Sequence, residues 1–195
     1  KGIVILGDPG SGKTLHLKRV LLWCLRKNPE SLGLPENMLP VFLPLRELED
    51  LDKGLDVFIQ KQLENPFLST PKNFGKRLLE RGNLLFLLDG LDEVSNIKKR
   101  EQVAKWIVDA FKYYPSCRFV VTCRFAGYSP TVRLSSGFLE MHIRPFNTQQ
   151  AESFIHNWYK IIERSLAKDT EQAATIADEK AKDLIQNLKE PVFRS

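Results

Sequence analysis

The sequence has no long apolar run, only three cysteines and no strong excess of either charge. No stretch of about 18 apolar residues is present, so no membrane-spanning helix is predicted. Residues 1–6 lack a charged segment followed by a long apolar stretch, so no signal peptide is indicated. Cys24, Cys117 and Cys123 form no Cys-x-x-Cys pair, which favours buried, reduced thiols in a cytoplasmic protein.

The charge balance is mild, with 29 Lys and Arg against 24 Asp and Glu and a net charge of +5. Lys98–Arg100 is the only tight basic triplet, and a solvated helix face explains such a triplet better than a nucleic-acid patch does. We therefore infer no nucleic-acid partner. The 195 residues suit one medium-sized globular domain with room for a small appended module.

Hydrophobic periodicity predicts strands alternating with helices as far as residue 145, and helices alone after it. This order indicates an α/β domain over residues 1–145 and the start of a helical subdomain over residues 146–195. Pro40 and Pro44 favour an edge or irregular position for the second strand. The expected strands are 2–6, 39–45, 84–89, 117–123 and 138–143, and the expected helices are 13–27, 54–64, 71–81, 97–113, 147–165 and 168–190.

Two of the expected helices carry terminal signals. Ser69 or Thr70 is expected to cap the helix at 71–81, and Gly82 is expected to end it. Asn147 and Gln150 have the spacing of a capping box at the start of the first helix after the sheet.

The segment GDPGSGKT matches G-x-x-x-x-G-K-[ST] and lies between an apolar strand and an amphipathic helix, as a phosphate-binding loop requires. Its glycines allow a tight turn that brings successive N–H groups around a phosphate. Lys13 supplies a mobile charge for the β- and γ-phosphates, and the Thr14 hydroxyl is a ligand for Mg²⁺. The helix that follows directs the positive end of its dipole at the same anion. We therefore predict nucleotide contacts at Gly7, Asp8, Pro9, Gly10, Ser11, Gly12, Lys13, Thr14 and Leu15.

An acidic segment that includes Asp89, Asp92 and Glu93 indicates whether the loop hydrolyses a nucleotide or only binds it. Asp89 ends an apolar strand, where its carboxylate is expected to emerge beside the loop and serve Mg²⁺. Asp92 and Glu93 follow closely, and one of them, preferably Glu93, is predicted to orient or deprotonate an attacking water. The alternative is that Asp92 or Glu93 caps the next helix.

The interval between Lys13 and Asp89 is long enough for an additional strand, so the strands carrying these two motifs are not expected to be neighbours in the sheet. This arrangement is that of the P-loop NTPases whose three-layer sandwich has an extra strand between the two Walker motifs, rather than that of the simple P-loop kinases. Arg124 ends the next strand, where an arginine can sense and stabilise the γ-phosphate. The alternative for Arg124 is a surface arginine without such a role.

Four motifs together resemble those of the NACHT NTPases of the STAND class: GDPGSGKT, LPVFLPLREL, LLFLLDGLDEV and VVTCR. The stretch IRPFNTQQAESFIHNWY resembles the segment that enters the first helical subdomain of that family. The likeness covers nearly the whole chain, in variants more typical of prokaryotic than of animal NLR-like proteins. The resemblance implies further segments before the first strand and after Pro191, so we expect a fragment of a longer protein.

This resemblance implies a cytoplasmic signalling switch, of a kind used in innate or anti-phage defence, that ADP keeps closed and that ATP opens to oligomerise. It implies Mg²⁺ with ATP or ADP as cofactors, with GTP as an alternative, and slow hydrolysis that resets the switch. Effector and sensor domains would lie outside this sequence, and self-association would run through the NACHT domain. Carried over by position, residues 7–14 bind phosphates, Thr14 and Asp89 serve Mg²⁺, and the catalytic group is Lys13, Asp92, Glu93 and Arg124.

Two other functions fit parts of the sequence. A non-hydrolysing scaffold would use the loop to hold ADP permanently. A P-loop kinase for a small acceptor would use the same loop, but no arginine-rich lid is recognisable, and the acidic pair after Asp89 suits water better than a kinase acceptor.

Overall fold

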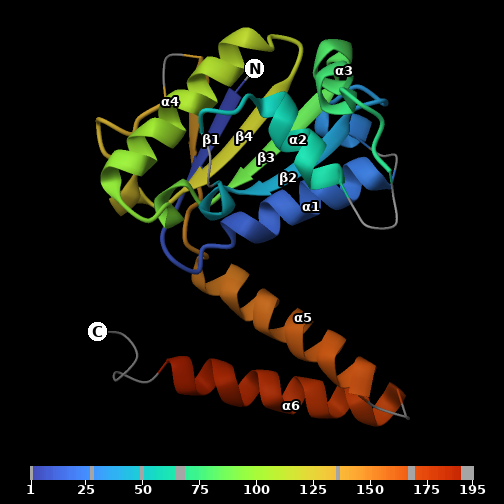
Figure 1. Cartoon of the computed structure of the whole chain (residues 1–195). Coiled ribbons are helices and arrows are strands. Elements are labelled where there is room, and N and C mark those ends of the chain that lie inside the picture. Colours follow the sequence, from blue (N-terminus) through green and yellow to red (C-terminus); the bar gives the residue numbers. More distant parts are fainter. Residues whose placement is uncertain are drawn as a thin grey trace. The chain divides into compact units, whose positions relative to one another are not determined.

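The computed structural model describes residues 2–26, 29–48, 51–64, 69–134, 137–166 and 170–189. The chain divides into two compact units, Lys1–Arg144 and Pro145–Ser195, which are treated separately below (Figure 1).

The first unit contains a five-stranded parallel sheet in the order β2-β3-β4-β1-β5. β1 therefore pairs with β4 and β5, and β4 separates it from β3. This order confirms the predicted P-loop NTPase architecture, in which an extra strand lies beyond the strand that carries Asp89. The strands are β1 (Gly2–Leu6), β2 (Leu39–Pro44), β3 (Leu84–Asp89), β4 (Arg118–Cys123) and β5 (Phe138–His142).

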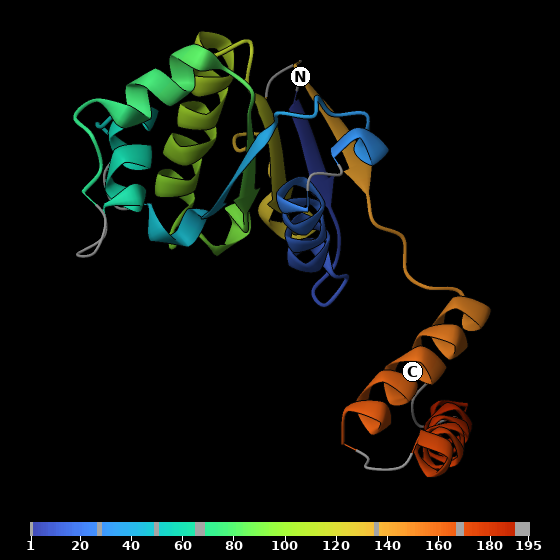
Figure 2. The same ribbon diagram turned by 90° about the vertical axis from the view of Figure 1, so that its right-hand side faces the viewer.

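Helices cover both faces of the sheet and make it the middle of three layers (Figure 2). α1 (Lys13–Leu25) lies on one face and buries Leu17 and Cys24 against Leu85 and Leu87 of β3. The opposite face holds the larger apolar core, which includes Phe86 stacked on Phe119 with ring centroids 4.9 Å apart. The helices on that face are α2 (Leu55–Leu63), α3 (Phe74–Arg81) and α4 (Ile97–Tyr113).

β3 is the most deeply buried strand, because its run of five apolar residues contacts helices on both faces. Leu84–Leu88 are at most 2% exposed, as expected for the centre of a parallel sheet. β2 is an edge strand, so the prediction from its two prolines is confirmed. All three cysteines are buried and free, also as predicted.

The predicted start of the helix at 71–81 is wrong. α3 begins only at Phe74, after Asn73 in a left-handed conformation with φ of 60°, and Thr70 Oγ1 donates instead to the carbonyl of Leu63. Gln60 of α2 replaces the expected cap, because its amide accepts from Gly75 N at 3.1 Å and donates to Pro71 O at 3.3 Å. A tertiary contact thus satisfies the backbone groups that a local side chain was expected to satisfy. The end at Gly82, with φ of 71°, is as predicted.

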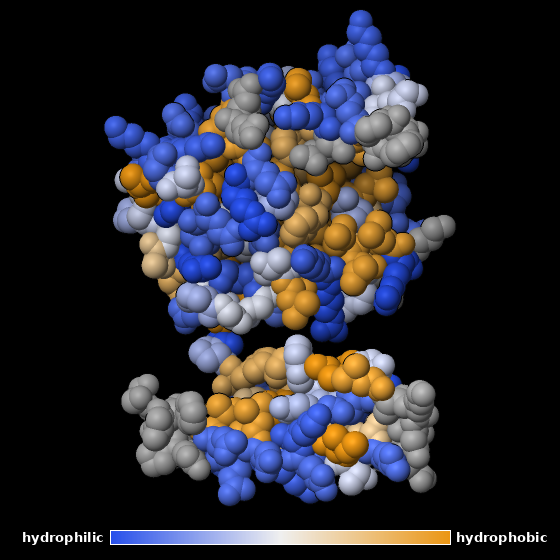
Figure 3. Space-filling view, turned by 60° about the horizontal axis from the view of Figure 1, so that its bottom comes forward, coloured by the Kyte–Doolittle hydropathy of each residue, from blue (hydrophilic) through white to orange (hydrophobic). Residues whose placement is uncertain are grey.

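The second unit is a pair of helices, α5 (Thr148–Leu166) and α6 (Thr170–Leu188). The predicted capping box is confirmed, because Asn147 Oδ1 accepts from Gln150 N at 2.8 Å and Gln150 Oε1 accepts from Asn147 N at 3.0 Å. Between the helices, the nearly buried Glu163 carboxylate accepts from Lys180 Nζ at 2.8 Å. Large apolar side chains remain exposed on α5, including Trp158 at 53%, and apolar surface is visible on this unit in Figure 3.

None of the helices within the described residues has the length and apolar character needed to cross a membrane.

Candidate functional site

The phosphate loop joins the buried end of β1 to the start of α1. Gly10 and Gly12 adopt positive φ angles of 76° and 85°, which side chains other than glycine rarely tolerate. Gly12 precedes α1 and offers no side chain to cap it, so the first N–H groups of the helix remain available to an anion. Lys13 Nζ donates to Gly7 O and Asp8 O at 2.8 Å each, and to Ser11 Oγ at 3.3 Å. The Lys13 ammonium is therefore folded back onto the loop itself.

Asp89 lies beside the loop and is oriented through both of its oxygens. Thr14 Oγ1 donates to Asp89 Oδ2 at 2.8 Å, and Thr122 Oγ1 donates to Asp89 Oδ1 at 2.6 Å. The Thr122 hydroxyl in turn accepts from Gly90 N at 2.8 Å, and its side chain is fully buried. The sequence analysis missed Thr122, and only its position just before Cys123 and Arg124 at the end of β4 could have drawn attention to it.

Thr14 and Asp89 are the two groups predicted to serve Mg²⁺, and their contact places a hydroxyl and a carboxylate oxygen side by side. Mg²⁺ in P-loop sites takes only one or two protein ligands and completes its shell with phosphates and water. The described residues contain no group of three His, Cys, Asp or Glu that could hold a metal ion. The donor set present here therefore fits a Mg²⁺ ion that arrives with a nucleotide.

Asp92 lies in the turn η3 (Leu91–Glu93) and is tied to Arg124 at the end of β4. Its Oδ1 accepts from Arg124 N at 2.8 Å, and its Oδ2 lies 3.1 Å from Arg124 Nε. Arg100 braces the same turn from α4, donating from Nη2 to the carbonyls of Asp92 and Val94 at 2.8 and 3.2 Å. Arg124 thus holds the Asp92 side chain, which is only 11% exposed, and Arg100 holds the backbone of the turn.

The close approach of Asp92 to the chain after β4 also depends on a glycine. A Cβ atom on Gly127, in the turn η4 (Phe125–Gly127), would collide with the Cβ of Asp92. Because Gly127 has no side chain, the two turns can come together and position Arg124.

Glu93 has a different partner from Asp92 and contacts Arg46. Arg46 Nη1 donates to Glu93 Oε2 at 2.8 Å, and the sequence analysis did not identify this arginine. Neither Asp92 nor Glu93 caps α4, because the cap is Asn96, whose Oδ1 accepts from Lys99 N at 2.8 Å. The capping alternative for the acidic pair is therefore excluded.

The phosphate loop, Asp89, the acidic pair and Arg124 line one cavity of about 390 Å³ at the carboxyl edge of the sheet. The cavity brings together most of the predicted phosphate, metal and catalytic residues, whereas Gly7, Asp8, Pro9 and Ser11 form the loop outside its lining. Lys18 lines it as well and was not predicted. The lining residues are Gly10, Gly12, Lys13, Thr14, Leu15, Lys18, Asp89, Gly90, Asp92, Glu93, Thr122 and Arg124.

Cys123 lies behind this cavity and is not a nucleophile. Burial, and after it the charge of Asp92, raise the pKa of the Cys123 thiol from 9.0 to about 12. The thiolate is the reactive form of cysteine, so this side chain is inert near neutral pH.

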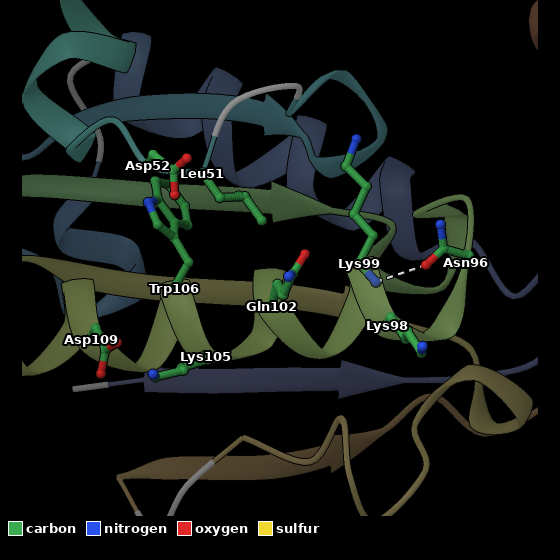
Figure 4. Close-up of a pocket in the computed structure, with 9 residues that line it drawn as sticks. All are labelled: Leu51, Asp52, Asn96, Lys98, Lys99, Gln102, Lys105, Trp106 and Asp109. Carbon is green, nitrogen blue, oxygen red and sulfur yellow. Dashed lines mark hydrogen bonds between the residues drawn. The ribbon is translucent and has the colours of Figure 1, made fainter.

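A larger cavity of about 870 Å³ lies on the outer face of α4 (Figure 4). Trp106, Gln102 and Lys99 extend from α4 toward the segment that carries Leu51 and Asp52 (Figure 4). This larger cavity is lined by neither the phosphate loop nor the acidic pair, so it is not the candidate site despite its size. The remaining residues that line it are Asn96, Lys98, Lys105 and Asp109.

The sheet order and the loop beside Asp89 define the class of protein as a P-loop NTPase. Within that class, residues 1–161 match the family model of the NACHT domain, and the chain belongs to this family. No curated protein matches the chain.

Solved structures share the fold at low sequence identity. The Aeropyrum pernix ORC1 protein in complex with DNA is 16% identical, with a TM-score of 0.53 over 97% of this chain and 56% of that one. Drosophila ORC bound to DNA is 14% identical, with a TM-score of 0.59 over 95% of this chain and 48% of that one. The chain thus spans about half the length of these two proteins, and the likeness concerns the fold alone.

Proposed function

We propose that the chain is the nucleotide-binding part of a switch that binds ATP or ADP with Mg²⁺ and hydrolyses ATP slowly. The observation that carries the proposal is a single cavity in which the phosphate loop faces Asp89, Glu93 and Arg124. GTP remains an alternative substrate, because the contacts described concern phosphates and not the base.

The chain's own residues divide the work in this proposal. The loop N–H groups and the Lys13 ammonium bind the phosphates, and the phosphates replace the loop oxygens that Lys13 contacts here. Arg124, held by Asp92, presents a fixed positive charge to the terminal phosphate. Glu93 orients or deprotonates the attacking water. Mg²⁺, held by Thr14 and Asp89, would neutralise charge on the phosphates.

The wider parts of the proposal rest on membership of the NACHT family. They are ATP-driven opening, self-association through this domain, and a cytoplasmic signalling role that includes defence. Effector and sensor domains belong to the same proposal. DNA binding is not part of the proposal, because the likeness to the two DNA-bound structures, at 16% and 14% identity, concerns the fold alone.

Nucleotide identity and turnover test the proposal directly. Nucleotide released from the denatured protein is identified by chromatography, and hydrolysis of ATP and GTP is assayed with Mg²⁺ for the wild type, Lys13→Ala and Glu93→Gln. We expect Lys13→Ala to weaken nucleotide binding by at least about tenfold, since it removes a charge-assisted phosphate contact. Glu93→Gln should retain binding and lose turnover. Lys112→Ala, an exposed lysine at the end of α4, is the matched control and should change neither.

A wild-type protein that binds no nucleotide in the presence of Mg²⁺ would contradict the proposal. Bound ADP without turnover in any form would favour the non-hydrolysing scaffold instead. One observation supports that second candidate: both carboxylates that follow Asp89 are neutralised by arginines.

A further inference from the structure

Arg46 and Glu93 lie in two short turns that follow neighbouring strands. η2 (Leu45–Glu47) follows β2, η3 follows β3, and the register of these strands places Pro44 opposite Asp89. Buried apolar residues anchor both turns, so the backbone is held while the polar side chains between the anchors face outward. The anchors, at most 2% exposed, are Leu45 and Leu48 in one turn and Leu91 and Val94 in the other.

The ion pair between these turns depends on a folded-back glutamate. A Cβ atom on Gly90, which has a positive φ of 75°, would lie 2.9 Å from Glu93 Cδ. The absence of that atom allows the Glu93 carboxylate to lie over the turn and accept from Arg46. In this position Glu93 is occupied by a cation and is not free to act on water.

The pair is accessible enough to be exchanged. The side chains of Arg46 and Glu93 are 60% and 36% exposed, and ion pairs of such exposure are weak and screened by salt. The other arginine of the site differs, because Asp92 binds both the backbone N–H and the side chain of Arg124. Arg46 is therefore the exchangeable cation and Arg124 the fixed one.

A nucleotide offers Arg46 a competing anion. Glu93 lines the same cavity as Lys13 and Thr14, and Arg46 contacts Glu93 without lining the cavity itself. Arg46 therefore lies one side chain away from the cavity that the terminal phosphate of ATP would enter. A guanidinium binds phosphate through two parallel hydrogen bonds, as it binds carboxylate, and a terminal phosphate carries more negative charge than one carboxylate. ADP lacks this phosphate and leaves Arg46 with Glu93 as its partner.

We infer that Arg46 distinguishes ATP from ADP: it stays on Glu93 when ADP is bound and transfers to the terminal phosphate when ATP is bound. The transfer frees the Glu93 carboxylate only when a hydrolysable phosphate is present. This inference rests on the proposed function and adds to it a specificity-determining residue that senses the nucleotide state.

Binding of ADP and of the non-hydrolysable ATP analogue AMP-PNP, each with Mg²⁺, tests the inference by calorimetry. Arg46→Gln should weaken AMP-PNP by about tenfold, the size of one charge-assisted contact, and leave ADP within about twofold. Glu93→Gln should tighten AMP-PNP by about threefold while Arg46 is present, and should have no such effect in the double variant with Arg46→Gln. Arg46→Lys should restore part of the loss, because it keeps the charge without the paired donors.

Arg133→Gln is the matched control, because Arg133 forms an equally exposed pair with Glu140, at 2.7 Å, away from the cavity. It should change neither affinity. Equal losses for ADP and AMP-PNP in Arg46→Gln, or additive effects in the double variant, would overturn the inference and leave the proposed function standing. A wild-type protein that binds neither nucleotide would overturn both.

Discussion

At the scale of single residues, Thr122 shows how a buried hydroxyl positions the candidate site. It bonds both the carboxylate predicted to serve Mg²⁺ and the N–H of Gly90, the glycine on which the folded-back Glu93 depends. Its full burial means that water cannot replace these bonds. The Thr122 side chain of β4 thus orients Asp89 and also holds the backbone at Gly90, at the start of the turn that carries Glu93.

Thr122→Val should lower the free energy of unfolding by about 1–3 kcal/mol, because the Gly90 N–H is left without a partner. It should also raise the Mg²⁺ concentration needed for nucleotide binding, since Asp89 loses one of its two orienting bonds. Thr122→Ser keeps the hydroxyl and should retain most of both properties. Urea denaturation and a Mg²⁺ titration of nucleotide binding measure the two effects, and equal behaviour of the Val and Ser variants would contradict the assignment.

At the scale of elements, the turn η3 is held by the residues that flank it as well as by its own backbone hydrogen bonds. Leu91 and Val94 are buried on either side, Arg100 reaches back from α4 to two of its carbonyls, and Asn96 starts that helix. The start of α4 therefore determines where Asp92 and Glu93 lie.

Asn96→Ala removes the cap of α4 and should cost about 1 kcal/mol of unfolding free energy. Asn96→Asp retains a good capping oxygen and should cost little, which makes it the matched control. Thermal or urea unfolding of both variants tests this prediction. If the two variants lost stability equally, the side-chain cap would not be what stabilises the helix start.

At the scale of the whole molecule, the chain consists of two compact units joined by a connection in which Phe146 is exposed. The connection between β5 and α5 has no regular secondary structure, and Phe146 within it is 62% exposed. The NACHT family match continues past this connection to residue 161, so the family unit includes much of α5.

Limited chymotrypsin digestion should cut early after Phe146 and leave fragments 1–146 and 147–195, because this exposed residue lies in the irregular connection between the two compact units. Mass spectrometry of the early products identifies the cut, and Phe146→Ser should remove it. A bond after Phe146 that outlasts bonds inside the sheet would contradict the prediction.

Several features followed from local sequence signals. The phosphate loop, the buried strand β3, the edge position of β2 and the Asn147–Gln150 capping box each depend on residues close together in the chain. The separation of β1 from β3 was predicted as well, but the strand between them is β4, which follows Asp89 in the sequence, and not β2 from the interval between the two motifs. The chemical roles of Lys13, Asp92, Glu93 and Arg124 stay predictions, although the fold brings their side chains to one cavity.

Other features depended on contacts between distant positions. Gln60 displaced the expected cap of α3, Thr122 oriented Asp89, and Arg46 neutralised Glu93 across 47 positions of the chain. Residue type and spacing determine local conformation, because backbone preferences and neighbouring side chains act over a few residues. The pairing of acidic and basic side chains depends on tertiary structure, because the carboxyl ends of β2, β3 and β4 come together at one edge of the sheet. The sequence alone therefore determined the nucleotide loop and the fold class, and only the tertiary structure decided the partners of its acidic groups.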